Sequence, residues 1–158
     1  MAESLIALNM LVPDFSAQIT GSQSFRLSDH AGKIIVLYFY PKDNTPGCTA
    51  QSIEFRDLND EFKQHGIEIV GVSRDSLRSH DAFKAKLALP FELISDPDET
   101  LCLMFNVMKQ KSMYGKSVRG VERSTFVIDA SGRLVKEWRG VKVTDHADEV
   151  LQYAKTLH

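Results

Sequence analysis

The sequence Ile34–Phe39 (IIVLYF), followed directly by Tyr40–Thr49 (YPKDNTPGCT), decides the fold prediction. The first six residues are β-branched, aliphatic or aromatic, which predicts a strand buried on both faces of a sheet. Residues 50–63 come next, with apolar side chains at approximately helical spacing: Ile53, Phe55, Leu58 and Phe62. Cys48 therefore lies where a buried strand turns into a helix.

This position favours a reactive Cys48. In the first turn of a helix the backbone N–H groups have no intrahelical acceptor, and the positive end of the helix dipole faces the same side chains. Both effects favour the thiolate, which is the nucleophilic form of cysteine. The alternative is an inert buried thiol, since free cysteine is among the most buried residue types.

Three residues, Pro41, Thr45 and Cys48, spell P-x-x-x-T-x-x-C after a hydrophobic strand. This spacing resembles the active-site signature of the peroxiredoxins, and YPKDNTPGCT is similar to the version in their bacterioferritin comigratory protein (peroxiredoxin Q) branch. Two later blocks, Lys111–Gly115 (KSMYG) and Arg123–Asp129 (RSTFVID), resemble the same branch. The resemblance thus covers most of residues 5–155.

The resemblance implies a thiol-dependent peroxidase that reduces hydrogen peroxide and organic hydroperoxides through a Cys48 sulfenic acid. It assigns Arg123 as the cation of the site, where the alternative is a solvated loop arginine. It assigns Pro41 as a shield of the thiolate, where the alternative is a strand terminator. Thr45 is expected to hydrogen bond the peroxide or the thiolate, or to cap the helix. The branch often has Glu at the position of Gln51, and this sequence departs from it there.

The second cysteine is the other departure. Many members of the branch carry a resolving cysteine at position 53 or in the next helix, but here position 53 is Ile53 and residues 77–89 contain no cysteine. Cys102 remains, in an apolar segment that favours a buried structural thiol. We therefore expect one-cysteine recycling by thioredoxin, glutaredoxin or glutathione, and a two-cysteine mechanism with Cys102 as the resolving residue stays an alternative.

Bulk properties narrow the classes of function. A chain of 158 residues with a net charge of −2 is expected to form a single thioredoxin-like domain over residues 1–158, with no nucleic-acid or membrane partner. Two cysteines and no N-terminal basic segment favour a reducing cytoplasm. The five histidines show no metal spacing, so we expect no metal and no cofactor. A monomer or weak homodimer is expected.

The remaining pattern predicts an α/β thioredoxin-like fold with a mixed central sheet and an N-terminal β-hairpin extension. In the first half of the chain, we expect a hairpin around Gly21 and Ser22, a strand at Ile67–Ser73 and a helix at Leu77–Leu89. A strand at Phe91–Ile94, a helix from about Asp98 to Asn106 and a long connection at Val107–Arg123 should follow. The chain should end with a hairpin of Ser124–Asp129 and Arg133–Trp138 and a last helix from Thr144 to about Leu157.

Three rival functions follow from the same residues. A disulfide oxidoreductase would need C-x-x-C, but Thr45 and Gln51 stand at the two positions that could complete it with Cys48. A cysteine hydrolase would need a histidine base, for which the distant His146 is the candidate. A non-catalytic thioredoxin-like binding module is the alternative that is not an enzyme.

Overall fold

A computed structural model describes residues 6–157. Its strands are β1 (Ser16–Ile19), β2 (Gln23–Arg26), β3 (Ile34–Phe39), β4 (Ile67–Ser73), β5 (Glu92–Ser95), β6 (Met108–Met113), β7 (Lys116–Val121), β8 (Ser124–Ile128) and β9 (Leu134–Arg139). Its helices are α1 (Pro46–Gln64), α2 (Leu77–Leu87), α3 (Thr100–Met104), α4 (His146–Ala154) and the short 3₁₀ helix η1 (Leu27–His30).

Strand β3 lies inside a seven-stranded mixed sheet of order β2-β1-β5-β4-β3-β8-β9. It pairs in parallel with β4 and antiparallel with β8, and all six of its residues are buried. Because side chains alternate along a strand, β3 supplies both faces of the sheet. Ile35, Leu37 and Phe39 join one apolar cluster, whereas Val36 and Tyr38 join the other.

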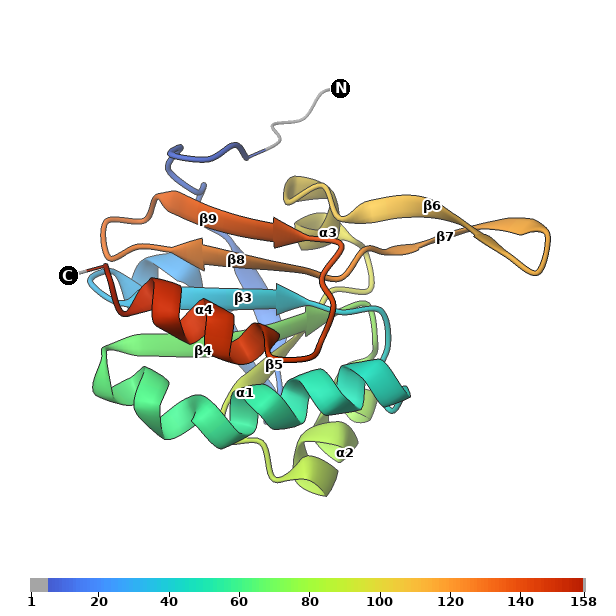
Figure 1. Ribbon diagram of the computed structural model, residues 1–158, viewed down its shortest axis with the longest axis horizontal. Helices are drawn as coiled ribbons and strands as arrows, with labels where there is room; N and C mark the ends of the chain where they lie inside the picture. The colour runs from blue at the N-terminus through green and yellow to red at the C-terminus, as the bar shows by residue number, and fades with distance from the viewer. Residues whose placement is uncertain (1–5, 158) are drawn as a thin grey trace.

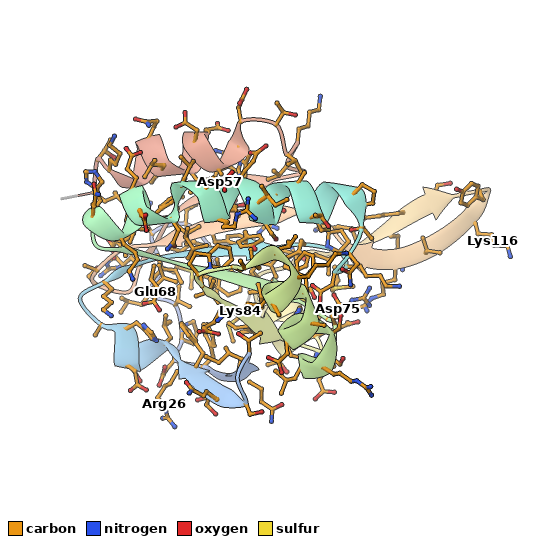
Figure 2. All side chains as sticks on the ribbon, turned by 90° about the horizontal axis from the view of Figure 1, so that it is seen from below. Arg26, Asp57, Glu68, Asp75, Lys84 and Lys116 are labelled. Carbon is orange, nitrogen blue, oxygen red and sulfur yellow. The ribbon has the colours of Figure 1, made fainter. Side chains whose placement is uncertain are left out.

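The two faces are covered differently (Figure 1). The cluster that contains Cys48 packs the sheet against α1, α2 and α4, with α1 and α4 in contact (Figure 2). The opposite cluster contains Cys102 and Phe105 from the α3 region together with Phe15 and Phe25 from the N-terminal hairpin. The two cysteines therefore belong to opposite faces of one sheet.

Gly71 in β4 lets the ring of Tyr38 lie flat against the neighbouring strand. A Cβ atom on Gly71 would lie 2.9 Å from Cζ of Tyr38 and 2.7 Å from Cδ2 of Leu93, closer than van der Waals contact allows. With Gly71 on one side, the Tyr38 ring stacks on Phe55 of α1, and the two ring centroids are 4.7 Å apart. This packing fixes α1, and with it Cys48, against the sheet.

The predicted α/β fold with a mixed sheet and an N-terminal hairpin is confirmed, and the strands at Ile34–Phe39 and Ile67–Ser73 have the predicted bounds. Helix α1 begins at Pro46, earlier than the apolar spacing from residue 50 indicates, because proline is well suited to the first helical position. Helix α3 is shorter than expected: it begins only at Thr100, after the left-handed Glu99.

The prediction of a long connection at Val107–Arg123 is wrong. Strands β6 and β7 form a hairpin there, which projects from the sheet and has Lys116 near its far end (Figures 1 and 2). Tyr114 and Gly115, with φ of 54° and 77°, make its two-residue turn. A turn with both central residues at positive φ usually contains Asn-Gly or Asp-Gly, so Tyr-Gly gave a weak signal.

Within residues 6–157, the structure contains no helix with the length and apolar character needed to span a membrane.

Candidate active site

Cys48 occupies the third position of α1, after Pro46 and Gly47. The first intrahelical bond of this helix runs from Thr49 N to Thr45 O. The N–H groups of Gly47 and Cys48 therefore have no acceptor within the helix, and they can donate to an oxygen atom placed near the sulfur. Only 1% of Cys48 is exposed, which holds its sulfur in a largely dry setting.

Arg123 brings a positive charge to this sulfur. It lies between β7 and β8, and its Nη1 atom is 3.5 Å from Sγ of Cys48. Its guanidinium also covers the start of α1, since a Cβ atom on Gly47 would lie 3.1 Å from Nη2. The absence of a side chain at Gly47 thus gives Arg123 room to approach. The structure places Arg123 and Cys48 together, as the resemblance implied.

Gln51 holds Arg123 in place with a neutral group. Its Oε1 atom accepts a hydrogen bond of 2.7 Å from the same Nη1 atom. An arginine can only donate, so the amide oxygen must face it, and the amide Nε2 must face away. Nε2 is buried and has no hydrogen-bond partner among the described residues. No carboxylate of residues 6–157 forms an ion pair with Arg123.

Thr45 precedes α1 with an extended backbone, but its side chain does not cap the helix. Its hydroxyl donates to the carbonyl of Lys42 at 2.8 Å. Because its proton is used there, the oxygen can act on a ligand only as an acceptor. Pro41 is half-buried two residues after β3 and has no backbone N–H group.

Cys102 lies apart from this group. It is fully buried in α3, on the other face of the sheet, and its backbone N–H donates to Oδ2 of Asp96 at 2.8 Å. Burial raises the pKa of the Cys102 thiol well above its ordinary value, and the nearby Asp96 carboxylate adds to this. Both cysteines are free thiols in the structure. The expectation that Cys102 is a buried thiol agrees with this setting.

His146, the candidate base for a hydrolase, is engaged elsewhere. Its Nε2 atom lies 2.8 Å from Oγ1 of Thr125, and its Nδ1 atom lies 3.6 Å from Oε1 of Glu149. Burial lowers its pKa, although Glu149 opposes the shift. Among residues 6–157, no hydrogen bond joins His146 to Cys48.

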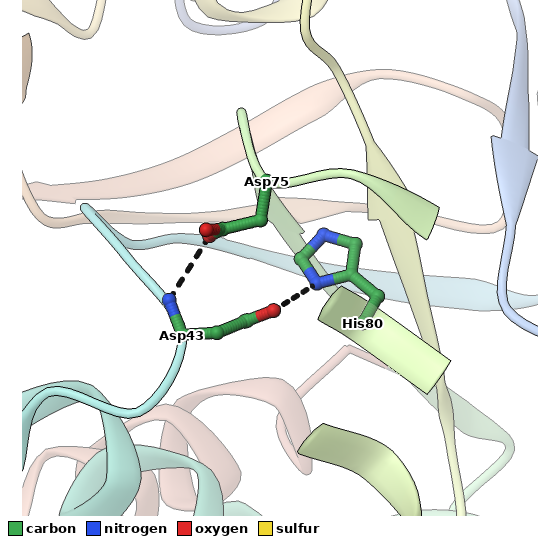
Figure 3. A group of neighbouring side chains, drawn as sticks. All are labelled: Asp43, Asp75 and His80. Atoms are coloured by element: carbon green, nitrogen blue, oxygen red, sulfur yellow. Dashed lines mark hydrogen bonds and ion pairs between the residues drawn. The ribbon is translucent and has the colours of Figure 1, made fainter. Parts of the chain in front are cut away.

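One group of potential metal ligands lies next to the loop that precedes α1: Asp43, Asp75 and His80 (Figure 3). These side chains satisfy one another and their neighbours. Oδ2 of Asp75 accepts from Asp43 N and from Ser73 Oγ, while Asp43 binds His80. The group is a hydrogen-bonded network that ties the loop to α2, and the sequence pattern gave no sign of it.

Two cavities of the described structure are lined by residues other than Cys48. One of about 350 Å³ is lined by residues that include Lys63, Ile67 and Phe91, at the start of β4, whereas Cys48 follows the end of the parallel neighbour β3. A hydroperoxide group is small, so the site needs aligned donors more than it needs volume. We therefore place the site at the start of α1.

Comparisons with known proteins identify relatives of the whole chain. The family model described as AhpC/TSA family matches residues 9–137. Peroxiredoxin Bcp of Xanthomonas campestris is 48% identical over 155 residues, which cover 98% of this chain and 97% of that protein. Peroxiredoxin Bcp of Bacillus subtilis is 47% identical over 152 residues, covering 96% and 97%.

The fold comparison points to the same group of proteins. A solved structure of the Xanthomonas campestris bacterioferritin comigratory protein, studied for its alkyl peroxide reduction activity, superposes with a TM-score of 0.89. The two sequences are 47% identical, and the match covers 98% of each chain.

Replacing Gln51 should have little effect on stability, despite its contact with Arg123. Gln51→Met removes a hydrogen bond to a charged group, worth about 1.5–3 kcal/mol, but it also removes a buried unpaired amide, which costs about 1–3 kcal/mol. We expect the free energy of unfolding, measured with urea, to change by less than about 1 kcal/mol.

Ser52→Ala is the matched control. It removes the hydroxyl that lies 2.9 Å from the buried Tyr38 hydroxyl, and so leaves a buried polar group without this partner. This variant should lose about 1–3 kcal/mol. If Gln51→Met lowered the free energy of unfolding as much as Ser52→Ala, removal of the unpaired amide would not offset the lost hydrogen bond, and the prediction would be wrong.

Proposed function

The chain belongs to the AhpC/TSA family, among its Bcp-type peroxiredoxins, and we propose that Cys48 is the residue that performs their thiol peroxidase reaction here. The observation that carries this proposal is the contact of 3.5 Å between Arg123 Nη1 and Cys48 Sγ at the start of α1. The substrates are hydrogen peroxide and alkyl hydroperoxides, the latter as studied for the Xanthomonas campestris relative.

The reaction is an in-line displacement on oxygen. The Cys48 thiolate attacks the terminal oxygen of the hydroperoxide, a sulfur–oxygen bond forms, and the oxygen–oxygen bond breaks. The sulfur is oxidised to sulfenic acid, and the peroxide is reduced to an alkoxide or hydroxide that takes up a proton. The product is an alcohol or water.

Forming the thiolate does not by itself make this step fast. Lowering the pKa of a thiol increases the thiolate fraction but reduces its nucleophilicity, with a Brønsted coefficient of about 0.4–0.5 in thiol–disulfide exchange. The two effects nearly cancel. The acceleration must therefore come from donors that align the peroxide and stabilise the charge that moves onto the leaving oxygen. Arg123 and the N–H groups of Gly47 and Cys48 are in place for this.

Thr45 has a complementary role. Its hydroxyl proton is donated to the Lys42 carbonyl, so its oxygen accepts a hydrogen bond from the O–H group of the bound hydroperoxide and orients the attacked atom. Pro41 shields the sulfur from water. These assignments follow the sequence signature, and the hydrogen bond from Thr45 to the Lys42 carbonyl supports the role of Thr45.

For recycling we propose an external thiol. Cys102 is buried on the opposite face of the sheet, and its thiol is strongly disfavoured as a thiolate. Thioredoxin, glutaredoxin or glutathione would attack the Cys48 sulfenic acid and complete its reduction, in a reducing cytoplasm. We also propose that the protein acts as a monomer or weak homodimer with a single domain.

The assignment of Cys48 is tested by Cys48→Ser. This variant should lose peroxidase turnover while keeping its circular dichroism spectrum and its unfolding midpoint near those of the unmodified protein. Peroxide consumption with dithiothreitol as reductant is the measurement, with Cys102→Ser as the matched control that keeps activity. Activity retained in Cys48→Ser would remove the proposal and leave the binding module as the alternative.

Arg123→Ala should slow peroxide attack by about 100-fold or more, because loss of one preorganised donor typically costs about 2.7–4 kcal/mol. Stopped-flow oxidation of the protein gives the rate, and ultraviolet absorbance gives the thiolate fraction. Arg119→Ala is the control. Arg119 lies in β7 and forms an ion pair with Glu99, the residue before α3, so its loss should leave the rate unchanged. If the slowing only matched the loss of thiolate, the transition-state role of Arg123 would be wrong.

The recycling proposal predicts the state of both cysteines after oxidation with one equivalent of peroxide. Dimedone should label Cys48 as sulfenic acid, and mass spectrometry should find Cys102 as a free thiol, because their positions on opposite faces prevent the approach that a disulfide requires. A Cys48–Cys102 disulfide peptide, together with loss of turnover in Cys102→Ser, would establish the two-cysteine mechanism instead.

A further inference from the structure

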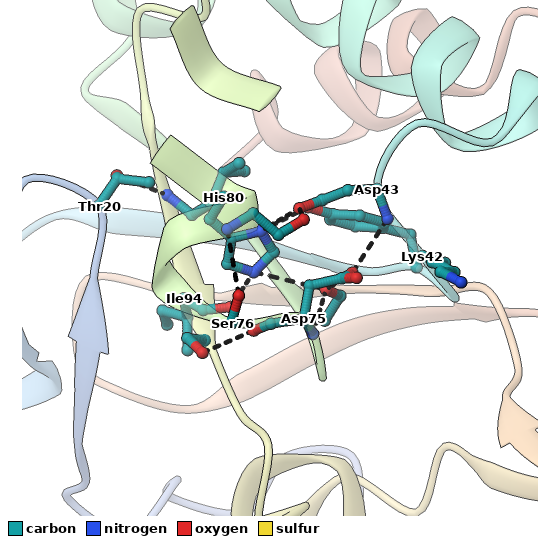
Figure 4. Close-up of polar contacts among 12 residues, drawn as sticks. Thr20, Lys42, Asp43, Asp75, Ser76, His80 and Ile94 are labelled. Atoms are coloured by element: carbon teal, nitrogen blue, oxygen red, sulfur yellow. Dashed lines mark hydrogen bonds and ion pairs between the residues drawn. The ribbon is translucent and has the colours of Figure 1, made fainter. Parts of the chain in front are cut away.

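His80 is fully buried at the start of α2, between the loop that precedes α1 and strand β5 (Figure 4). Its Nδ1 atom lies 2.8 Å from Oδ2 of Asp43, and its Nε2 atom lies 2.9 Å from the carbonyl oxygen of Ile94. The ring therefore joins the loop to the sheet through both nitrogens.

The two acceptors determine where the ring protons are. A backbone carbonyl can only accept, so Nε2 must carry a proton. Both oxygens of the Asp43 carboxyl receive hydrogen bonds from hydroxyl groups, Oδ1 from Tyr40 and Oδ2 from Ser79, as those of an ionised carboxylate do. Burial alone would raise the pKa of Asp43, but its hydrogen bonds lower it below the ordinary value. A carboxylate also only accepts, so Nδ1 must carry a proton as well.

The neighbouring hydroxyl groups do not donate to the ring, so both nitrogens still need a proton of their own. Tyr40 OH, 3.5 Å from Nδ1, donates to Oδ1 of Asp43 at 2.6 Å. Ser73 Oγ, 3.4 Å from Nε2, donates to Oδ2 of Asp75 at 2.5 Å. Neither hydroxyl has a proton left for the ring. The titratable groups that face His80 among the described residues are thus Tyr40, Asp43 and Asp75.

We propose that His80 is held as an imidazolium and acts as a positioning residue for Cys48, by fixing the Asp43 loop to α2 and β5 through a buried ion pair. This inference rests on the proposed role of Cys48. The pair acts on the reaction through the loop: Asp43 stands between Pro41 and Thr45, and Thr45 in turn precedes α1 directly. His80 does not touch the sulfur in the structure.

The hydrogen bonds that join this loop to α2 and to the turn after β4 run through Asp43. The Asp43 backbone N–H is bound by Asp75, its carboxylate by His80, Ser79 and Tyr40, and the next residue, Asn44, has a φ of 66°. Loss of the ion pair frees the loop to move, which displaces the Thr45 acceptor from the peroxide. A displacement of about 1 Å can reduce the rate of an aligned reaction by about 100-fold.

The protonation state is tested first, on the unmodified protein. Long-range ¹⁵N–¹H spectra at neutral pH should show both His80 nitrogens in the protonated range. In Asp43→Asn the amide can donate to Nδ1, so this nitrogen should become unprotonated while Nε2 stays protonated. A neutral His80 ring in the unmodified protein would overturn the proposal, and this result does not depend on the role of Cys48.

The kinetic test uses His80→Gln, which can satisfy only one of the two acceptors with its amide group. We expect the rate constant of Cys48 oxidation, measured per folded molecule well below the unfolding temperature, to fall at least about tenfold. His30→Gln is the control, because His30 also binds a carboxylate, Glu68 at 2.8 Å, but precedes β3, whereas the Asp43 loop follows the opposite end of that strand. It should keep the rate.

A purely structural role would lower the unfolding temperature of His80→Gln and leave this rate constant unchanged, and that outcome would reject the positioning role. If His80→Gln does not fold, Asp43→Asn replaces it in the kinetic test and should also slow oxidation. Failure of the Cys48 assignment is recognised separately, by turnover that persists in Cys48→Ser.

Discussion

The contact of the Arg123 guanidinium with the Cys48 sulfur is the interaction on which the site depends. It joins two segments that are far apart in the chain, and it requires several independent features of the fold. Strand β3 must deliver Cys48 to the start of α1, and β8 must pair beside β3 so that Arg123, directly before β8, reaches the same end of the sheet. Gly47 must also lack a side chain for the guanidinium to approach.

The partner of Arg123 sets the charge of the site. Gln51 orients the guanidinium through a carbonyl oxygen, and the first turn of α1 contains no acidic residue. Because Gln51 is neutral, it does not neutralise the charge of Arg123. In the proposed reaction this charge is available to the sulfur and to the leaving oxygen. A carboxylate in the same position would orient the guanidinium equally well, but it would compete with the developing negative charge of the transition state. The unpaired Nε2 atom is the structural cost of this neutral support.

Local patterns predicted the core of the fold and the position of Cys48 near the start of a helix, because the signals were strong and close together: the run Ile34–Phe39, and the motif of Tyr40–Thr49 directly after it. Patterns failed where the structure depends on contacts between distant segments. The β6–β7 hairpin was missed because its turn residues are Tyr114 and Gly115, and the His80–Asp43 pair was missed because no spacing rule links a loop to the next helix. Arg123 was found only through the family resemblance, since one arginine in a loop carries no signal of its own.

The burial of Cys48 creates opposite demands in the two halves of the reaction. In the reaction proposed here, peroxide attack needs a dry and rigid site, a demand that the Arg123 contact and the His80–Asp43 pair would meet, and a hydroperoxide is small enough to enter it. A protein thiol is not, and with 1% of Cys48 exposed it cannot reach the sulfenic acid unless the start of α1 or the Asp43 loop moves. The polar contacts that hold this loop are hydrogen bonds and one ion pair, which can re-form after each opening, whereas the apolar contacts of β3 and Phe55 beneath them stay in place. Under the proposed assignments, reduction by a protein thiol therefore requires a rearrangement at the start of α1 or in the Asp43 loop, whereas peroxide attack requires the same segments to stay in place.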